Sequence, residues 1–493
     1  MRVLMVASEA VPFAKTGGLA DVAGALPGAL ARLGCDVTLV IPAYREVFAK
    51  GLSIEPTGLS FEVPIGTRRP TARILRGELP GSGVPVVFVA NDECFDRPTL
   101  YGGAEDYPDN AERFIFFARA ALEFAGRQDR PFDILHCHDW QAGLVPAYQK
   151  LVYRAWPMLS GARSVITIHN MAYQGLFWHW DMLLTGFNWK YFNWQQMEFY
   201  GQLSFLKTGL VFADAISTVS PTYAREIQRD PGGCGLEGVL AARSDSLTGI
   251  VNGIDTTAWN PQTDRHIPRG YGSDDAAEGK AASKTALAAR LGRNAVDPRP
   301  LVGLVGRLVE QKGIDLVIEM LGRMASVGRA RFVILGTGSA ETEEALRRVS
   351  ASFPGAVDVV IGFDEEFAHL LFAAADIMLV PSRYEPCGLT QLYALRYGTI
   401  PVVRATGGLV DTVVDATPEA LATGRASGFV FDAFDSLALE HAVERALAAH
   451  ADRAMWAHLV RRVMAEDWSW ETSAREYLRL FERVRGLPSI AVT

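Results

Sequence analysis

The chain has 493 residues, of which 49% are hydrophobic, and a formal net charge of −8 at pH 7. This length and apolar content predict two domains with sizeable cores and exclude a disordered chain. The negative charge argues against a general nucleic-acid or membrane-surface binder. An anionic ligand would therefore need a local group of basic side chains.

The cysteines and the N-terminal segment bear on the compartment. The five cysteines are odd in number and widely spaced, and no Cys-x-x-Cys pair occurs, so we expect neither a zinc site nor a disulfide framework. Glu9 and Pro12 interrupt the first apolar run, which is unlike a signal peptide. The sequence has no run of about 18 apolar residues, so we expect no membrane-spanning helix. We expect a cytoplasmic protein.

The first half of the chain alternates apolar runs of strand length with helical patterns such as Asp109–Phe124. The expected strands are Val3–Ala7, Val37–Ile41, Val84–Val89, Ile134–His136, Ser164–Ile168, Ala215–Val219 and Leu247–Val251. Continuously apolar strands separated by helices predict an α/β domain whose parallel sheet is covered on both faces.

A polar, turn-rich segment, Trp259–Asn294, follows, and then the strand pattern restarts. The second series comprises Leu301–Val305, Arg331–Leu335, Val357–Ile361, Ile377–Val380 and Thr399–Val403. A final helix, Glu471–Val484, places apolar side chains on one face. We therefore expect two α/β domains, residues 1–251 and residues 252–467, with the crossing near Asn252–Asp255.

The first motif, Lys15-Thr16-Gly17-Gly18 with Asp21, follows the first strand. Paired glycines let the backbone approach a ligand closely, and a lysine supplies a point charge for phosphate. Taken alone, such a turn would more often be structural.

Histidines end two later strands. His136 and His138 precede Asp139 and Trp140, and His169 precedes Asn170. His-x-His with a nearby aspartate permits a metal site, but no further ligands stand at metal spacing and no Asp-x-Asp occurs. We expect packed, hydrogen-bonded histidines and no metal. The tryptophan-rich stretch Trp178–Trp194 fits either a core or a surface on which sugars stack.

Charged side chains follow two strands of the second half. Arg307 and Lys312 leave the first strand at the edge where open α/β sheets bind ligands, although scattered charges on a solvated loop are the plainer interpretation. Glu385 follows Ile377–Val380, and we expect a helix to begin near Gly388. The carboxylate could be only a helix cap, and Cys387 a small residue in a tight turn.

These motifs, in this order, resemble the bacterial glycogen synthase and plant starch synthase family, from Met1 to about Val484. The resemblance implies a GT-B fold, in which two Rossmann-like domains face a central cleft and the last helix crosses back. Residues 468–493 would then complete the first domain, on the acceptor side, and residues 252–467 would bind the nucleotide sugar. The implied activity is retaining transfer of glucose from ADP-glucose to the non-reducing end of an α-1,4-glucan (glycogen), without a metal or other cofactor.

The resemblance also implies roles for individual residues. The catalytic group comprises Glu385, Arg307, Lys312 and His169. The substrate-binding group comprises Lys15, Gly17, Gly18, Asp21, Tyr101, Asp139, Trp140, Asn170, Asn252, Phe363, Cys387, Gly388, Leu389 and Thr390. Backbone N–H groups of Gly388–Thr390 would hold phosphate or sugar oxygens.

The chain departs from the patterns of related transferases at two positions. Phe363 lacks the hydroxyl of the usual tyrosine, and Tyr393 stands where many related transferases carry a second glutamate, as it does in the synthases. Sucrose-type, trehalose-type or UDP-glucose-dependent transferases stay open. A dinucleotide-dependent oxidoreductase would need a Gly-x-Gly-x-x-Gly that is missing, and a non-catalytic glucan-binding protein would not need Arg307, Lys312 and Glu385 together.

Overall fold

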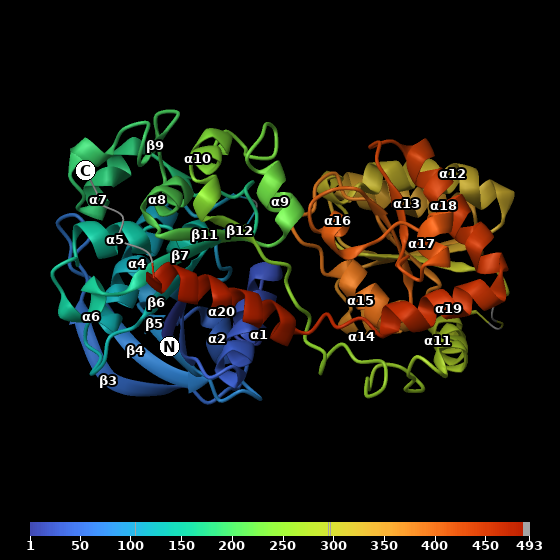
Figure 1. Ribbon diagram of the computed structural model, residues 1–493, viewed down its shortest axis with the longest axis horizontal. Helices are drawn as coiled ribbons and strands as arrows, with labels where there is room; N and C mark the ends of the chain where they lie inside the picture. The colour runs from blue at the N-terminus through green and yellow to red at the C-terminus, as the bar shows by residue number, and fades with distance from the viewer. Residues whose placement is uncertain (104, 294, 296, 487–493) are drawn as a thin grey trace. The chain divides into compact units, whose positions relative to one another are not determined.

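The computed structural model describes residues 1–103, 105–293, 295 and 297–486 (Figure 1). They form two compact units: unit 1 comprises Met1–Gly253 and the C-terminal segment from Trp470, and unit 2 comprises Ile254–Ser469. The sequence places both divisions two residues earlier. The end of the expected segment Trp259–Asn294 and the end of the final segment, 487–493, lie outside the described residues. No helix in the described ranges has the length and apolar character of a membrane span.

Unit 1 is built on a nine-stranded sheet in the order β12-β11-β7-β6-β1-β2-β5-β4-β3. Its strands are β1 (Arg2–Val6), β2 (Asp36–Pro42), β3 (Glu55–Glu62), β4 (Thr71–Glu78), β5 (Pro85–Ala90), β6 (Ile134–His138), β7 (Arg163–Ile168), β11 (Ala215–Thr218) and β12 (Leu247–Gly249). Val3 of the central β1 pairs with Val37 on one side and Ile134 on the other, both in parallel. A small second sheet joins β8 (Leu176–Phe177), β10 (Gln202–Ser204) and β9 (Glu198–Phe199).

The predicted parallel sheet is confirmed in unit 1, but one edge carries two antiparallel strands that were not predicted. β3 and β4 were not among the expected strands; they pair antiparallel with each other, and β4 also pairs antiparallel with β5. The side chains of β4 alternate between exposed and buried, which is typical of an antiparallel edge with one solvated face. Such alternation does not produce the continuous apolar run that marks a buried parallel strand.

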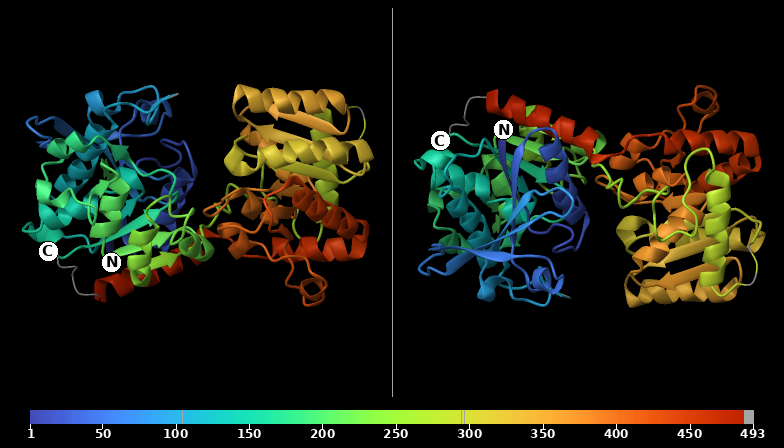
Figure 2. Two further views of the ribbon diagram at one scale, coloured as in Figure 1. Left: turned by 90° about the horizontal axis from the view of Figure 1, so that it is seen from above. Right: turned by 90° about the horizontal axis from the view of Figure 1, so that it is seen from below.

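Helices cover both faces of this sheet (Figure 2). The helices of unit 1 are α1 (Gly18–Arg32), α2 (Arg45–Ala49), α3 (Asp92–Phe95), α4 (Asn110–Ala125), α5 (Val145–Leu151), α6 (Pro157–Ser160), α7 (Met182–Thr185), α8 (Phe205–Phe212), α9 (Pro221–Glu226), α10 (Glu237–Ala242) and α20 (Trp470–Gly486). The last helix, α20, packs against α1 and β7, as expected. Arg32 pairs with Glu471, and the His136 ring contacts Tyr477 at a tilt and Phe481 edge-on.

Unit 2 has a six-stranded, fully parallel sheet in the order β15-β14-β13-β16-β17-β18. Its strands are β13 (Leu301–Val305), β14 (Arg331–Gly336), β15 (Val357–Ile361), β16 (Ile377–Val380), β17 (Ile400–Arg404) and β18 (Phe429–Phe431). One layer of helices contains α12 (Ile314–Val327), α13 (Ala340–Ser352) and α18 (Ser436–Ala451); the other contains α11 (Ala276–Arg290), α14 (Glu365–Ala374), α15 (Thr390–Arg396) and α19 (Arg453–Met464) (Figure 1). The short helices α16 (Gly408–Thr412) and α17 (Pro418–Ala422) precede β18.

Each sheet has a point where the strand order reverses. In unit 1 the chain runs outward from β1 in one direction and from β6 in the other, and in unit 2 the same reversal lies between β13 and β16. Loops at the carboxyl ends of such neighbouring strands diverge and leave a crevice, which is where open α/β sheets bind ligands.

Candidate functional site

In unit 2, the predicted charged residues meet at the reversal point. Lys312 follows β13 and Glu385 follows β16, and Lys312 Nζ lies 2.5 Å from Glu385 Oε2. The same carboxylate oxygen accepts a hydrogen bond from Ser382 Oγ at 2.8 Å. Glu385 is buried, and a pocket beside it is lined by both strand ends, including Arg307, Lys312, Ser382 and Thr390. Glu385 is therefore an ion-paired carboxylate rather than a helix cap.

Two glycines fix the backbone around Glu385. A Cβ on Gly313, whose φ is +69°, would stand 2.0 Å from the Pro381 carbonyl oxygen. A Cβ on Gly407, whose φ is +47°, would stand 1.9 Å from the Glu385 carbonyl oxygen. Only glycine fits such close approaches, so these positions set the strand-end geometry of the site.

The helix after Glu385 begins later than expected, at Thr390 rather than near Gly388. Gly388 has a φ of +77°, which is incompatible with a helical residue. Leu389 is the N-cap and offers no capping side chain. The turn is held by Gln391, a residue that the sequence did not single out, because its buried amide donates to the carbonyls of Cys387 and Gly388.

Arg307 stands apart from this ion pair. Its side chain is exposed, and Nη2 donates to Gln311 Oε1 at 3.2 Å. The guanidinium therefore keeps its charge near solvent at the mouth of the pocket, where an anion could reach it.

In unit 1, the Lys15 loop follows β1 and leads into α1, which begins at Gly18 with Gly17 as its N-cap. Lys15 Nζ lies 2.7 Å from Asp21 Oδ1, and Asp21 lies in the first turn of α1, where the helix dipole favours a negative charge. The backbone amides of Thr16 and Gly17 donate to the buried carboxylate of Glu9.

The histidine-bearing strands form a buried polar cluster. Asp139, with a φ of +54°, accepts a hydrogen bond from the His169 backbone amide at 2.7 Å, and burial raises its pKa to about 7. His138 Nδ1 lies 2.9 Å from His169 Nε2, and burial lowers the pKa of His169 to about 3. The ring of His169 is therefore neutral at pH 7 and serves as a hydrogen-bonding group. Among the described residues, no group of three His, Cys, Asp or Glu side chains is placed to hold a metal ion.

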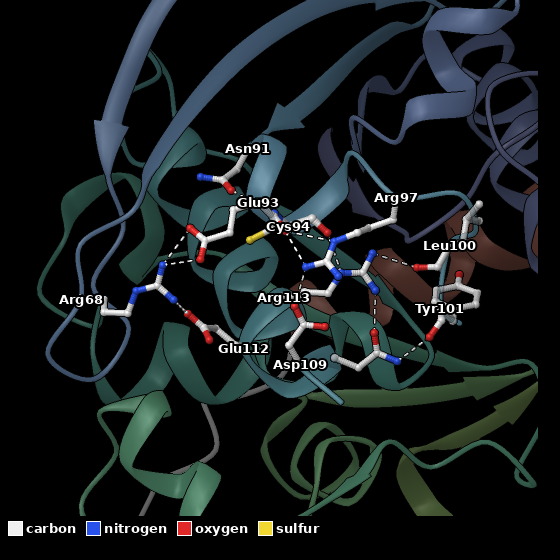
Figure 3. A network of polar contacts seen from close by, with 11 residues as sticks. Arg68, Asn91, Glu93, Cys94, Arg97, Leu100, Tyr101, Asp109, Glu112 and Arg113 are labelled. Carbon is white, nitrogen blue, oxygen red and sulfur yellow. Dashed lines mark hydrogen bonds and ion pairs between the residues drawn. The ribbon is translucent and has the colours of Figure 1, made fainter. Parts of the chain in front are cut away.

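Tyr101 is held from two sides. Its hydroxyl lies 2.7 Å from Ser8 Oγ and donates to Glu9 Oε1 at 3.0 Å. Arg113, only 1% exposed, donates to the carbonyls of Cys94 and Leu100 and so fixes the loop from behind (Figure 3). Neither Glu9 nor Arg113 was predicted to belong to the site. A charged residue near an apolar strand end or inside a helix gives no sequence signal that its partners are loop carbonyls and amides.

Of the other predicted residues, Trp140 and Asn170 border these clusters, because the Trp140 ring contacts Tyr101 and the Asn170 backbone hydrogen-bonds Asp139. Trp140 is buried, and its ring packs on Phe114 at 4.8 Å. Asn252 is buried near the end of unit 1, and Asn170 bonds the Ala172 amide. Phe363 is 87% exposed after the edge strand β15, which β14 separates from β13.

The tryptophan-rich stretch does not form a core. Trp178, Trp180, Trp189 and Trp194 are all exposed. The ring of Trp180 contacts those of Trp178 and Trp189.

Two α/β units with polar clusters at their strand-order reversals fit a two-domain glycosyltransferase, and family models show that the chain is of this class. The model of the starch synthase catalytic domain matches residues 2–242, and that of glycosyl transferases group 1 matches residues 290–462. The chain belongs to the family of glycogen and starch synthases. It is 43% identical to the glycogen synthase of Rhodopirellula baltica over 99% of this chain and 98% of the relative. It is 47% identical to glycogen synthase 2 of Geobacter sulfurreducens over 98% of each chain.

Solved structures show the same fold. The catalytic domain of starch synthase IV from Arabidopsis thaliana, bound to ADP and acarbose, superposes with a TM-score of 0.90 at 34% identity, covering 98% of this chain and 99% of that one. Sucrose-phosphate synthase from Thermosynechococcus elongatus has a TM-score of 0.57 at 18% identity, with 98% of each chain covered, and shares the fold alone.

Proposed function

We propose that this protein transfers glucose from ADP-glucose to the 4-hydroxyl at the non-reducing end of an α-1,4-glucan such as glycogen, with retention of configuration. The observation that carries the proposal is the Lys312–Glu385–Ser382 cluster beside Arg307 in a chain of this family. In this proposal, unit 2 binds the nucleotide sugar, and unit 1 supplies the acceptor side and Lys15 as a further ligand of the nucleotide sugar. The relatives named glycogen synthase, and the ADP in the Arabidopsis structure, support the choice of substrates.

The chemistry chiefly requires stabilisation of the leaving ADP. The bond between the glucose C1 and the diphosphate oxygen breaks, and negative charge develops on the diphosphate. Arg307 and Lys312 would stabilise that charge, which is the kind of preorganised electrostatic contribution that dominates many enzymes. The acceptor hydroxyl would form the new bond on the same face of C1, and its proton would go to the departing phosphate.

The polar groups near the transferred sugar complete the proposal. Glu385 would face the positive charge that develops on the sugar ring, and neutral His169 would hydrogen-bond the sugar. Because Arg307 and Lys312 can balance the diphosphate charge, we propose that no metal or other cofactor takes part. A cytoplasmic location is proposed from the cysteine usage: all five cysteines lie in the described residues, none forms a disulfide, and only Cys234 is exposed.

A donor and acceptor matrix tests this function. Purified protein would be assayed with ADP-glucose or UDP-glucose, and with glycogen or fructose 6-phosphate, using Glu385→Gln as the background control. We expect glycogen elongation with ADP-glucose to be the fastest combination. Equal or better rates with UDP-glucose would refute the donor, and transfer to the small acceptor alone would refute the glucan.

A further inference from the structure

A carboxylate with no assigned role lies at the centre of the unit 1 cluster. Glu9 follows the end of β1 and is only 3% exposed. Its oxygens accept hydrogen bonds from the Thr16 backbone amide, the Thr16 hydroxyl at 2.9 Å, the Gly17 backbone amide at 3.2 Å and the Tyr101 hydroxyl at 3.0 Å. All of these donors belong to two loops, and none belongs to a neighbouring strand.

Burial of this carboxylate is costly unless its oxygens are satisfied. Desolvation raises the pKa of Glu9, while its hydrogen bonds to Thr16, Tyr101 and Gly17 oppose that rise. A core position would be more stable with an apolar side chain, so the presence of a buried acid calls for a reason beyond packing. The reason lies in the two loops whose donors the Glu9 carboxylate binds.

One of the two loops carries Lys15. The Thr16 and Gly17 amides follow that lysine directly, and both donate to the same oxygen, Oε2. This pair of bonds fixes the backbone immediately before α1 and therefore the direction in which Lys15 leaves the loop. Lys15 Nζ is additionally fixed by Asp21 at 2.7 Å.

The other loop carries Tyr101 and is rigid on its far side. Asn110 Nδ2 donates to the Tyr101 carbonyl at 2.8 Å, and buried Arg113 holds the Leu100 carbonyl at 2.9 Å. In Figure 3, Tyr101 and Leu100 lie at one end of this network, and Arg113 points at them from α4. Because Tyr101 is fixed in this way, the hydrogen bond from its hydroxyl also fixes the Glu9 carboxylate.

We infer that Glu9 is a positioning residue: it ties the Lys15 loop to the Tyr101 loop and so holds the Lys15 ammonium in place for the sugar-nucleotide donor. The inference rests on the proposed function only in assigning the donor as the ligand of Lys15. Glu9 itself has no part in bond breaking.

The bonding pattern separates the effect of the hydrogen bonds from the effect of the charge. In Glu9→Gln, the amide oxygen can take the place of Oε2 and accept from Thr16 and Gly17. The amide NH2 can then donate to the hydroxyl oxygens of Tyr101 and Thr16, which accept as well as donate. Glu9→Ala loses every one of these bonds. A positioning role therefore predicts that glutamine rescues most of what alanine loses.

The test compares these two variants with a matched control, Glu123→Ala. Glu123 is also buried, at 7% exposed, and accepts from a tyrosine hydroxyl, Tyr153, at 2.7 Å, but it lies at the far end of α4 from the Tyr101 loop. We expect Glu9→Ala to raise the donor KM about 10-fold and to lower kcat about 10- to 100-fold, as small misplacements of a binding group do. The KM for glycogen should be unchanged, Glu9→Gln should stay within about threefold of wild type, and Glu123→Ala should change neither constant.

Hydrogen exchange supplies a readout that needs no substrate. The Thr16 and Gly17 amides should be protected in wild type and in Glu9→Gln, and should exchange at least about 10-fold faster in Glu9→Ala but not in Glu123→Ala. If Glu9→Ala fails to fold, Tyr101→Phe removes one bond to Glu9, together with the hydroxyl contact to Ser8, and should raise the donor KM by about threefold.

Three results would overturn the inference: unchanged donor KM and kcat in Glu9→Ala, glutamine as damaging as alanine, or no difference in exchange at Thr16 and Gly17. Failure of the proposed function gives a different result. A wild type inactive with ADP-glucose and glycogen would refute the donor and acceptor, while the exchange measurement would still decide whether Glu9 holds the Lys15 loop.

Discussion

Removing Lys312 should cost both stability and activity, and a double variant should separate the two losses. The ammonium of Lys312 lies 2.5 Å from Glu385, whose side chain is 7% exposed. Removing one partner of a buried ion pair costs about 3–5 kcal/mol, because the other charge stays buried without a partner. The Lys312 side chain is 27% exposed and Ser382 still donates to Glu385, so water and one hydroxyl reduce the cost. We therefore expect Lys312→Met to destabilise unit 2 by about 2 kcal/mol.

This cost converts into a measurable shift in Tm. For a domain of the size of unit 2, 1 kcal/mol moves the Tm by about 2–4 °C, so Lys312→Met should lower the unit 2 transition by about 4–8 °C. In Lys312→Met/Glu385→Gln no charge is left buried without a partner, and most of this loss should be regained. The kcat should fall by about 10²-fold in each single variant and should not be regained in the double variant, because in the proposed mechanism both groups act on the reacting substrate.

Calorimetry and initial rates at saturating ADP-glucose measure the two quantities on the same preparations. Arg307→Ala is the matched control: its side chain is exposed and donates to Gln311, so it should lower kcat by about 10²-fold with no change in Tm. The reasoning fails if Lys312→Met keeps kcat within about threefold of wild type, or if the double variant regains activity together with stability.

Three further predictions concern metal, backbone and pH. Dialysis against EDTA should leave the rate unchanged, and a loss restored by Mg²⁺ or Mn²⁺ would contradict the proposed cation pair. Gly407→Ala should abolish activity, because its Cβ would overlap the Glu385 carbonyl oxygen, whereas Gly424→Ala, with a φ of +65° but open space around it, should be mild; equal activities would refute this role. Burial raises the Asp139 pKa from 3.8 to about 7, so this carboxyl holds its proton in the native but not in the unfolded protein between about pH 4 and 7, and its contribution to stability falls as pH rises through that range. Asp139→Asn removes that slope, so its deficit in urea unfolding against wild type should shrink from pH 5 to pH 8, and parallel profiles would refute the shift.

The elements that the sequence predicted well are those whose pattern is local. Buried parallel strands are continuous apolar runs, and β1, β7 and β16 lie within a residue of their expected bounds. The edge strands β3 and β4 were missed because solvent on one face allows polar residues at alternate positions. The start of α15 was misplaced because the positive φ of Gly388 follows from its surroundings and not from residue type alone.

The site residues also divide into those with a local sequence pattern and those whose role depends on distant partners. Arg307, Lys312 and Glu385 could be singled out because they follow strands that end at one edge of a sheet, but their roles were assigned only through the family resemblance. Glu9 was interpreted only as an interruption of an apolar run, and Arg113 only as one residue of a helical pattern. Their importance depends on partners far along the chain, Tyr101 for one and Leu100 for the other, and such pairings exist only in the folded protein.

The two units each hold a lysine in place with a neighbouring carboxylate. Each places a lysine at its strand-order reversal and pairs it with a carboxylate, Lys15 with Asp21 and Lys312 with Glu385. A lysine held by a carboxylate is already positioned, so less side-chain entropy is lost when an anion binds, but the anion must compete with that carboxylate. In the proposed mechanism this competition would be useful in unit 2, because Ser382 could keep its bond to Glu385 after Lys312 turned to a phosphate. Donor binding would thus release Glu385 from its cation at the moment when a positive charge develops on the sugar, and the carboxylate would stabilise the transition state more than the ground state.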